Sequence, residues 1–490
     1  MPNAGYTPVI AGVGFGDQRC ESIAEAREPF DLMLEAIRNA AADAGAPGFL
    51  PRASSVRVID GVWPYQDPGR ALAQEIGCPG AQSVLTPFSG TMVSVAIHDA
   101  ARAVQRGDLD IVIIVAAECG YTRGRARKQG VKLEWRKLPG KPDLTLAPEL
   151  EMAHPVELEL GIRRPVEVYP MFDNALRHRD GISVEAHLDR LGALAAAFSE
   201  IAATNSHAWI QESRTADEIS RPGPGNRRIS FPYTLHLNSN NRVDQGAAII
   251  LCREETARQV GVPREKWVYP RCGTEADDCK FASERDSFSE SAAVRFAGQK
   301  IYELEGIEPG DLRHVDLYSC FPSAVQVAAR ELALPHETPR TVTGGMTFAG
   351  GPMNCYVIRS TATMVERLRQ HPGELGLVTG NGGYLAKHAL TTYSTEPEAA
   401  GFRFSNQQAR VDQLPKREVA DRWAGECEVE TYSVMYGSDG PDRAYVACRL
   451  PDGRRGWGIC RDPDVMQAMT EKEFCGRAAE RSQQAELRFV

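Results

Sequence analysis

The sequence predicts an α/β protein whose core contains two copies of one β-α-β-α-β unit. Short β-rich runs alternate with amphipathic helices along most of the 490 residues, which is typical of an α/β core. The order turn, helix, turn and buried strand over 89–120 recurs over 344–383. Because element order and spacing agree together, the recurrence indicates an internal duplication.

Each copy is predicted from apolar patterning. The first copy is expected to contain strand 7–14, a helix with Met33, Ile37, Ala40 and Ala44 on one face, strand 56–62, helix 89–107 and the fully apolar strand 109–120. The second is expected to contain strand 267–275, helix 291–304, strand 314–320, helix 355–370 and strand 374–383, which has a glycine-rich exit. Strand segments such as 7–14 and 109–120 are mostly apolar, without alternation of apolar and polar residues, which indicates strands covered on both faces.

Two further segments interrupt or extend this pattern. A long stretch between the halves begins with 121–142, which holds eight Lys or Arg against one Glu. After residue 400, short strands alternate with turns such as Pro451-Asp452-Gly453, which predicts a small β domain. The predicted domains are a first half (1–120 and 236–262), an inserted loop domain (121–235), a second half (263–400) and a small β-rich domain (401–490).

Composition narrows the function classes. The net charge of -9 offers no counterion-release argument for nucleic acid. No secretory signal opens the sequence, and no apolar run reaches the ~18 residues of a membrane helix. Twelve cysteines are scattered singly without metal-ligand spacing, so we expect reduced thiols in a cytoplasmic protein and no metal site.

Several motifs together resemble the thiolase superfamily in order and spacing over about residues 5–400. The matching segments are "IVIIVAAECG", with Glu118 in register, helices 169–209, "NRVDQGAAIIL" (241–251, with Gln245 inserted), "GGMTFAGGPMNCY" (344–356) and "VTGNGG" (378–383). The loop region is similar to the sterol-carrier thiolases and acetyl-CoA acetyltransferases. The closest subgroup is the thiolase-like proteins of type 1, whose additional C-terminal domain would account for 401–490.

The resemblance implies a thiolase fold, an α/β/α/β/α layering of two parallel-type sheets around buried helices. It also implies a coenzyme A thioester as ligand, with no tightly bound cofactor. Activity does not follow from the fold, because function depends on the site.

The catalytic set of the family is changed at every position. Pro87 stands where the nucleophilic cysteine is expected, Gly351 replaces the histidine of Gly-His-Pro, and Thr379 replaces the second cysteine. Ser89 offers a hydroxyl nearby, but without a base it is more typical of a helix cap.

Three other side chains have chemical potential. Tyr318 falls where relatives place an acid or base, as in steroid side-chain retro-aldolases that use tyrosines, or it is a strand-end residue satisfied by backbone. Cys320 precedes a helix start, where thiolate character is favoured, but a small buried thiol is the better interpretation. His388, beside Tyr384 and Lys387, is a candidate base or a structural histidine.

Two segments are candidate ligand contacts. Asn381, Gly382 and Gly383 would bring backbone N–H groups close to a thioester as an oxyanion-type loop; a tight turn is the alternative. Arg123, Arg125, Arg127, Lys128 and Lys132 would meet the phosphates of coenzyme A; a solvated charged face is the usual explanation.

Two hypotheses remain open at this point. The chain is either an acyl-CoA-processing enzyme, as an acyltransferase or as an aldolase on β-hydroxyacyl-CoA, or a binding module that has lost catalysis. Homodimer and monomer both remain open.

Overall fold

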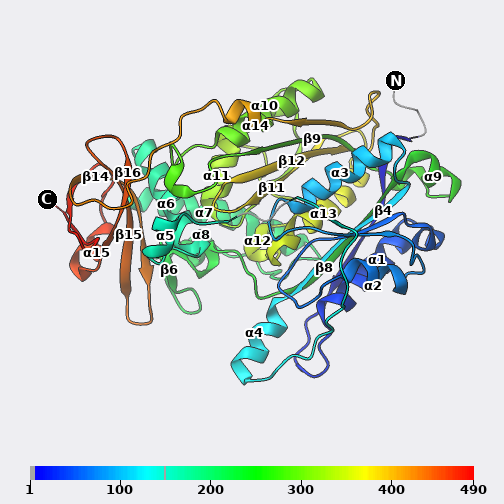
Figure 1. Ribbon diagram of the computed structural model, residues 1–490, viewed down its shortest axis with the longest axis horizontal. Coiled ribbons are helices and arrows are strands. Elements are labelled where there is room, and N and C mark those ends of the chain that lie inside the picture. Colours follow the sequence, from blue (N-terminus) through cyan, green and yellow to red (C-terminus); the bar gives the residue numbers. More distant parts are fainter. Residues whose placement is uncertain (1–5, 148–150, 490) are drawn as a thin grey trace.

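The core consists of two β-sheets with helices between them and outside them. The computed structural model describes residues 6–147 and 151–489. Helices α3 (Met92–Arg106) and α13 (Tyr356–Gln370) lie between the sheets (Figure 1). Their apolar faces join one buried cluster with side chains of both sheets, including Ile249 and Tyr393. Together with the helices on the outer face of each sheet, this arrangement makes the five expected layers.

The first sheet is mixed. Its strands are, in spatial order, β1 (Pro8–Asp17), β8 (Asp244–Arg253), β4 (Ile111–Cys119), β2 (Ser55–Val58), β3 (Gln82–Leu85) and β5 (Leu144–Thr145). Strand β8 runs antiparallel to both β1 and β4, whereas β2, β3 and β5 are parallel neighbours. Helices α1 (Pro29–Asp43) and α2 (Pro68–Glu75) cover its outer face.

The second sheet repeats this plan. Its strands are β10 (His314–Asp316), β11 (Gly376–Gly382), β12 (Lys387–Ser394), β9 (Tyr269–Asp277) and β13 (Arg403–Asn406). Helices α10 (Ala292–Glu305) and α11 (Pro322–Glu331) contribute to the cluster on its outer face. Strand β12 is antiparallel to both neighbours. The prediction that the sheets are of the parallel type is therefore wrong for this strand. A tight hairpin joins β11 to β12, and only antiparallel strands accept so short a connection.

The inserted segment is mostly helical. It contains α4 (Gly120–Gln129), α5 (Pro155–Glu159), α6 (Pro165–Asp180), α7 (Val184–Thr204) and α8 (Ala216–Ser220), then β6 (Arg228–Phe231) and β7 (Tyr233–Thr234). Three shorter helices are α9 (Glu254–Gln259), α12 (Gly345–Phe348) and α14 (Gln408–Val411), and a fourth, α15 (Pro463–Met469), packs against the strands at the C-terminal end of the chain. Helix α4 projects from the body of the molecule (Figure 1).

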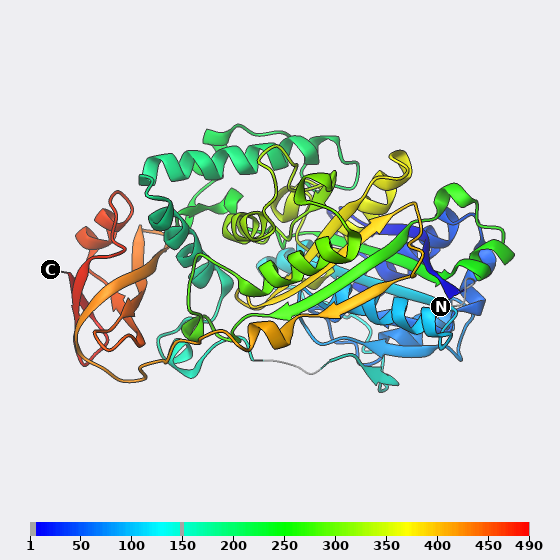
Figure 2. The ribbon, with the colours of Figure 1, turned by 90° about the horizontal axis from the view of Figure 1, so that it is seen from above.

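A third sheet forms the end of the molecule away from the first half (Figure 2). It consists of β16 (Arg455–Cys460), β15 (Pro441–Arg449), β14 (Gly425–Tyr436), β17 (Ala478–Arg481) and β18 (Leu487–Phe489). Strand β6 of the inserted segment pairs with β14 through Phe231 and Val434. The C-terminal sheet therefore includes a strand from the middle of the chain.

The expected strand over 314–320 ends early, at Asp316. The next backbone N–H groups leave the strand ladder: Leu317 N–H donates to the Arg340 carbonyl at 2.9 Å, and Tyr318 N–H donates to Thr379 Oγ1 at 2.9 Å. Among the residues that the structure describes, no helix has the length and apolar character needed to cross a membrane.

Arg359 on α13 ties the inner helix layer to the first sheet. Its guanidinium donates to both carboxylate oxygens of Asp17, at 2.6 and 3.0 Å, and to the carbonyls of Gly246 at 2.9 Å and His207 at 2.7 Å. The Arg359 side chain is 5% exposed. The Asp17 side chain is 31% exposed, but removing the buried guanidinium would leave this carboxylate and two carbonyls without their donor, which is costly.

We expect Arg359→Met to lower the free energy of unfolding by about 3 kcal/mol. Arg461→Met, which removes a pair with Glu486 whose side chains are 50% and 57% exposed, should change it by less than about 1 kcal/mol. Urea unfolding followed by circular dichroism measures both. Equal losses in the two variants would show that Arg359 is no anchor.

Glu118 closes β4 in a buried position. Its Oε1 accepts a hydrogen bond from Val62 N–H at 2.6 Å, and Arg123 Nη1 lies 3.4 Å from its Oε2. Burial raises the pKa of this carboxyl from 4.5 to about 7. Between these two pH values the folded protein holds a proton that the unfolded chain has released, so this group makes stability fall as pH rises.

We expect Glu118→Gln to remove this pH dependence. From pH 4.5 to pH 7.5 the unfolding free energy of the variant should rise by about 3 kcal/mol relative to the parent, since each pKa unit is worth about 1.4 kcal/mol. The exposed Glu303→Gln is the control and should show no such trend. A flat difference for Glu118→Gln, measured by urea unfolding across this range, would contradict the assigned shift.

Candidate functional site

A cavity of about 240 Å³ opens where the two halves meet the inserted segment. Three parts of the chain form most of its wall: the turn before α3, the ends of β10 and β11, and the start of α6. Its described lining residues are Phe88, Ser89, Gly90, Met152, Pro165, Val166, Tyr169, Asn238, Ser239, Asn241, Tyr318, Cys320, Phe321, Met346, Met353, Asn354, Asn381, Gly382, Gly383 and Lys387. We call this cavity the core pocket.

Two glycines let the halves touch at the core pocket. A Cβ atom on Gly90 would overlap the Asn381 carbonyl oxygen and the Tyr318 hydroxyl. A Cβ atom on Gly382 would overlap Ser89 Oγ. The turn before α3 and the end of β11 therefore approach more closely than side chains would allow.

Tyr318 lies in the wall of the core pocket with its hydroxyl beside Gly90. Its ring packs edge-on against Tyr356, with centroids 5.7 Å apart. Among the described residues no group forms a hydrogen bond with the hydroxyl, whereas the backbone N–H is bound by Thr379. Burial raises the pKa of Tyr318 well above its ordinary value, so the group is a neutral phenol that can donate a hydrogen bond.

Cys320 also lines the core pocket, as a thiol. The Asn381 side-chain amide donates to its Sγ at 3.7 Å. Burial raises the pKa of Cys320 to about 12, which favours the neutral thiol over the thiolate at neutral pH. The geometry agrees with the interpretation of Cys320 as a packed neighbour.

Ser89 lines the core pocket but has no activating base. Its Oγ lies 3.0 Å from Thr91 Oγ1. No imidazole or carboxylate belongs to the described lining of the core pocket. The hydroxyl pair lies at the start of α3, but the Thr91 side chain makes no cap hydrogen bond there, and Ser89 Oγ accepts only a long one, from Thr91 N–H at 3.5 Å.

The glycine-rich exit of β11 borders the core pocket, with Asn381, Gly382 and Gly383 in its wall. Tyr169 of α6 holds this exit, because its hydroxyl accepts from Asn381 Nδ2 at 2.9 Å and from Leu385 N–H at 3.0 Å, and donates to the Gly383 carbonyl at 3.1 Å. The amide oxygen of Asn381 is buried and has no partner among the described residues. The oxyanion role of this exit stays a prediction.

His388 lies behind the core pocket and not in its lining. Its Nε2 is 3.2 Å from the Leu385 carbonyl, 3.4 Å from Ser291 Oγ and 3.6 Å from Asp278 Oδ2. Burial opposes ionisation of Asp278, but Arg285 and His388 outweigh it and hold the pKa of that carboxyl below its ordinary value. Within this ion-pair cluster, His388 does not face the core pocket as the expected base would.

The predicted coenzyme A contacts lie elsewhere. On α4, Arg123 donates to the Val62 carbonyl at 2.6 Å and Arg125 to the Cys20 carbonyl at 2.7 Å, while Arg127 and Lys128 are exposed. Lys132 pairs with Glu134 at 2.9 Å on the surface. None of these basic residues lines the core pocket, and neither does Gly351, which packs against Ser239.

The candidate site residues derived from the sequence do not include Tyr169 or Lys387, which both line the core pocket. Tyr169 is the first residue of the thiolase-like segment 169–209, but its role depends on partners more than 200 positions away. Lys387 stands next to His388 and is the one charged side chain of the described lining. The alternation of side chains along a strand is the signal that could have identified Lys387, because neighbouring residues point to opposite faces.

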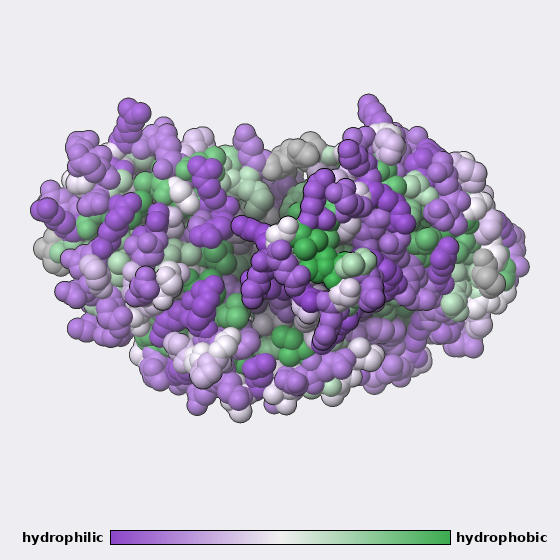
Figure 3. Space-filling view, turned by 90° about the horizontal axis from the view of Figure 1, so that it is seen from below, coloured by the Kyte–Doolittle hydropathy of each residue, from purple (hydrophilic) through white to green (hydrophobic). Residues whose placement is uncertain are grey.

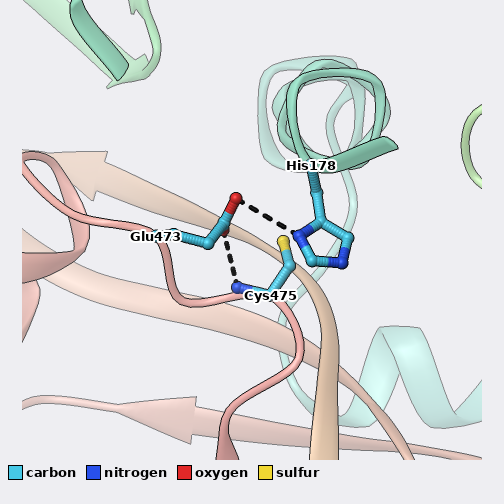
Figure 4. Close-up of side chains that lie close together, drawn as sticks. All are labelled: His178, Glu473 and Cys475. Carbon is cyan, nitrogen blue, oxygen red and sulfur yellow. Dashed lines mark hydrogen bonds and ion pairs between the residues drawn. The ribbon is translucent and has the colours of Figure 1, made fainter. Parts of the chain in front are cut away.

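Among the residues that the structure describes, two groups of side chains are spaced for a metal ion: His178 with Glu473 and Cys475, and His314 with His371 and Glu374. In the first group, His178 Nδ1 lies 3.3 Å from Glu473 Oε2 (Figure 4). Arg177 already donates to both oxygens of that carboxylate, at 3.0 and 3.1 Å, and burial raises the pKa of the Cys475 thiol. This group acts as an ion-pair contact between α6 and the C-terminal sheet.

The C-terminal sheet also supports the back of the core pocket. Arg455 on β16 is fully buried, pairs with Glu430, and donates to the Ser283 carbonyl at 3.0 Å and to the Arg285 carbonyl. Arg285 in turn donates to the Leu385 carbonyl at 2.7 Å. Leu385 adjoins the exit that Tyr169 holds, so one chain of buried hydrogen bonds links the sheet to the core pocket.

Comparisons with known proteins agree with this architecture. Residues 406–484 match the family model described as the thiolase-like protein type 1 additional C-terminal domain. The crystal structure of a monomeric SCP2-thiolase like protein type 1 from Mycobacterium smegmatis is 27% identical, with a TM-score of 0.84 over all of both chains. An Ltp2-ChsH2(DUF35) aldolase is 19% identical, with a TM-score of 0.61 over 81% of this chain and 100% of that one.

A curated relative, the acetyl-CoA acetyltransferase of Methanocaldococcus jannaschii, is 23% identical over 244 residues, which are 48% of this chain. The chain spans only 55% of the length of that relative. The family model, the full-length structural match and the acetyltransferase relative all agree with the sequence motifs. The chain therefore has the thiolase fold that its sequence predicts, and over its whole length it is similar to a thiolase-like protein of type 1.

Proposed function

We propose that the core pocket binds an acyl-CoA thioester, and that the Tyr318 hydroxyl donates a hydrogen bond to the thioester oxygen during aldol-type cleavage or formation of a C–C bond. The observation that supports this most is the Tyr318 hydroxyl itself. It is a buried phenol beside Gly90, without a protein partner among the described residues. A preorganised donor in a water-poor pocket stabilises the negative charge that an enolate develops on oxygen.

The residues that line the core pocket support covalent acyl transfer less well. The family's nucleophile position is Pro87, Cys320 is a neutral thiol, and Ser89 lacks a base. An acyl-enzyme requires an activated nucleophile. An aldol reaction requires none, and so it tolerates the loss of the cysteines.

The proposed reaction is balanced without a further reactant. In the cleavage direction the Cα–Cβ bond of a β-hydroxyacyl thioester breaks, and its electron pair forms the enolate. The β-hydroxyl loses its proton and becomes a carbonyl, and the enolate carbon gains a proton. The products are an aldehyde or ketone and a shortened thioester.

The relatives support the choice of substrates to test. The first curated relative is named an acetyl-CoA acetyltransferase, and one solved relative is described as an aldolase. The aldolase is 19% identical, so its likeness concerns the fold alone. β-Hydroxyacyl-CoA compounds therefore belong in the panel beside saturated acyl-CoA compounds.

One observation favours a second function, a binding module without catalysis. A retro-aldol step needs a group that removes the hydroxyl proton, and the described lining of the core pocket contains no imidazole or carboxylate. The raised pKa of Tyr318 makes it a donor more than a base. Saturable binding of thioesters without turnover would support the module.

Tyr318→Phe separates the two functions. If the phenol acts in catalysis, we expect turnover of a β-hydroxyacyl-CoA to fall about 100-fold, while the dissociation constant rises no more than about tenfold. Folding should be unchanged, since the hydroxyl has no protein partner to lose. Cys320→Ala is the matched control and should keep activity within about threefold; its inactivation with normal folding would contradict our assignment.

Intact-mass spectrometry tests the covalent alternative directly. After incubation with acyl-CoA and rapid acid quenching, we expect the parent mass without an acyl adduct, because the described lining of the core pocket has no activated nucleophile. An adduct that disappears in Cys320→Ala or Ser89→Ala would instead identify an acyltransferase. A thiolase with its cysteine intact serves as the positive control.

A further inference from the structure

Lys387 occupies a defined place in the wall of the core pocket. It begins β12 and pairs across the hairpin with Gly382. The ideal Cβ position on Gly382 lies 3.6 Å from Lys387 Cβ and overlaps Ser89 Oγ. Lys387 therefore stands beside the glycine contact that joins the two halves, one residue along β11 from Asn381.

The charge of the core pocket comes from this one side chain. The other described lining residues are apolar groups, hydroxyls, amides, a thiol and glycines. Carboxylates, imidazoles and guanidinium groups do not occur in the described lining. An unneutralised ammonium in a partly apolar pocket attracts an anion more strongly than a surface lysine does.

The Lys387 ammonium has no close protein partner. No hydrogen bond and no ion pair within 4 Å joins it to another described residue. Its cross-strand neighbour Asp277 attracts it at longer range and lines a separate cavity. Burial lowers the pKa of Lys387, against the attraction of Asp277, and an anionic ligand would relieve this cost.

We propose that Lys387 binds a carboxylate on the acyl group of the ligand, so that the preferred substrates are thioesters of dicarboxylic acids. This inference rests on the proposed function, since it requires that the core pocket receives the acyl end of a thioester. It names the substrate class, which neither the family nor the relatives provide.

Two parts of an acyl-CoA carry suitable anions, the acyl chain and the phosphates of the nucleotide. The position of Lys387 favours the acyl chain. Gly382 follows Asn381, whose carbonyl oxygen lies against Gly90 together with the Tyr318 hydroxyl. Lys387 is thus close to the group that faces the thioester, whereas the pantetheine arm holds the phosphates far from it.

The test uses calorimetry to compare succinyl with butyryl thioesters, each of pantetheine and of coenzyme A. Adipyl and hexanoyl thioesters form the same comparison for longer chains. For the parent protein we expect the carboxylate thioester to bind at least about tenfold tighter than its neutral partner in both series. In Lys387→Gln this preference should shrink to within about threefold. Lys387→Arg should keep most of it, and the remote Lys300→Gln should keep all of it, with melting temperatures confirming the fold of each variant.

The outcomes separate three cases. Equal binding of neutral and carboxylate thioesters by the parent overturns this inference but leaves the proposed function standing. A loss in Lys387→Gln that affects both coenzyme A thioesters equally, and no pantetheine thioester, assigns the ammonium to a phosphate and also overturns it. If no thioester binds at all, the proposed function fails and the inference fails with it.

Discussion

The contact between Gly90 and Gly382 is the constraint on which the core pocket depends. Here the turn before α3 meets the end of β11, and neither position has room for a methyl group. Here the two halves approach closely, beside the helix layer that they share, and Tyr318, Ser89, Asn381 and Lys387 surround the contact. A larger residue at either glycine would have to push the sheets apart or displace the phenol.

Burial then determines what each group of the core pocket can do. The surroundings that shield Tyr318 and Cys320 from water favour their neutral forms. The phenol becomes a donor and the thiol becomes a packing group, although both side chains are reactive in water. The same burial makes the Lys387 charge costly, so the pocket is suited to a ligand with negative charge near its reacting end. The face seen in Figure 3, by contrast, is mainly hydrophilic, with a small hydrophobic patch near its centre.

The sequence predicts the fold well where apolar patterning is continuous. Helices α3 and α13 and strand β4 fall within a few residues of their expected positions, because the helices carry apolar residues at helical spacing and the strand is an unbroken apolar run. The short strands β3, β13 and β17 were not predicted, since four residues carry too little pattern. The duplication and the family motifs also identified Tyr318 and the exit of β11 as part of a site.

The remaining site residues depend on three-dimensional facts that a sequence does not carry. Successive residues of a strand point to opposite faces, so Lys387 and His388 cannot both face the core pocket. Histidine is the more usual acid or base at neutral pH and is therefore the candidate that the sequence offers. The strand register instead places the lysine in the wall of the core pocket. In the basic run, Arg123 and Arg125 of α4 donate to carbonyls of the first half, which a sequence pattern does not show; the phosphate contact of the run stays a prediction.

The pairing of β6 with β14 shows that the C-terminal domain is not a separate module, although it lies at the end of the chain. By sequence, residues 406–484 look like a module appended to a complete enzyme fold. In space, the sheet of that module takes in a strand of the inserted segment, and its Arg455 holds the carbonyls of 283 and 285. The C-terminal sheet is therefore completed by the inserted segment. A chain cut before residue 406 would leave β6 and the carbonyls of 283 and 285 without their partners, so the insert and the extension form one structural unit.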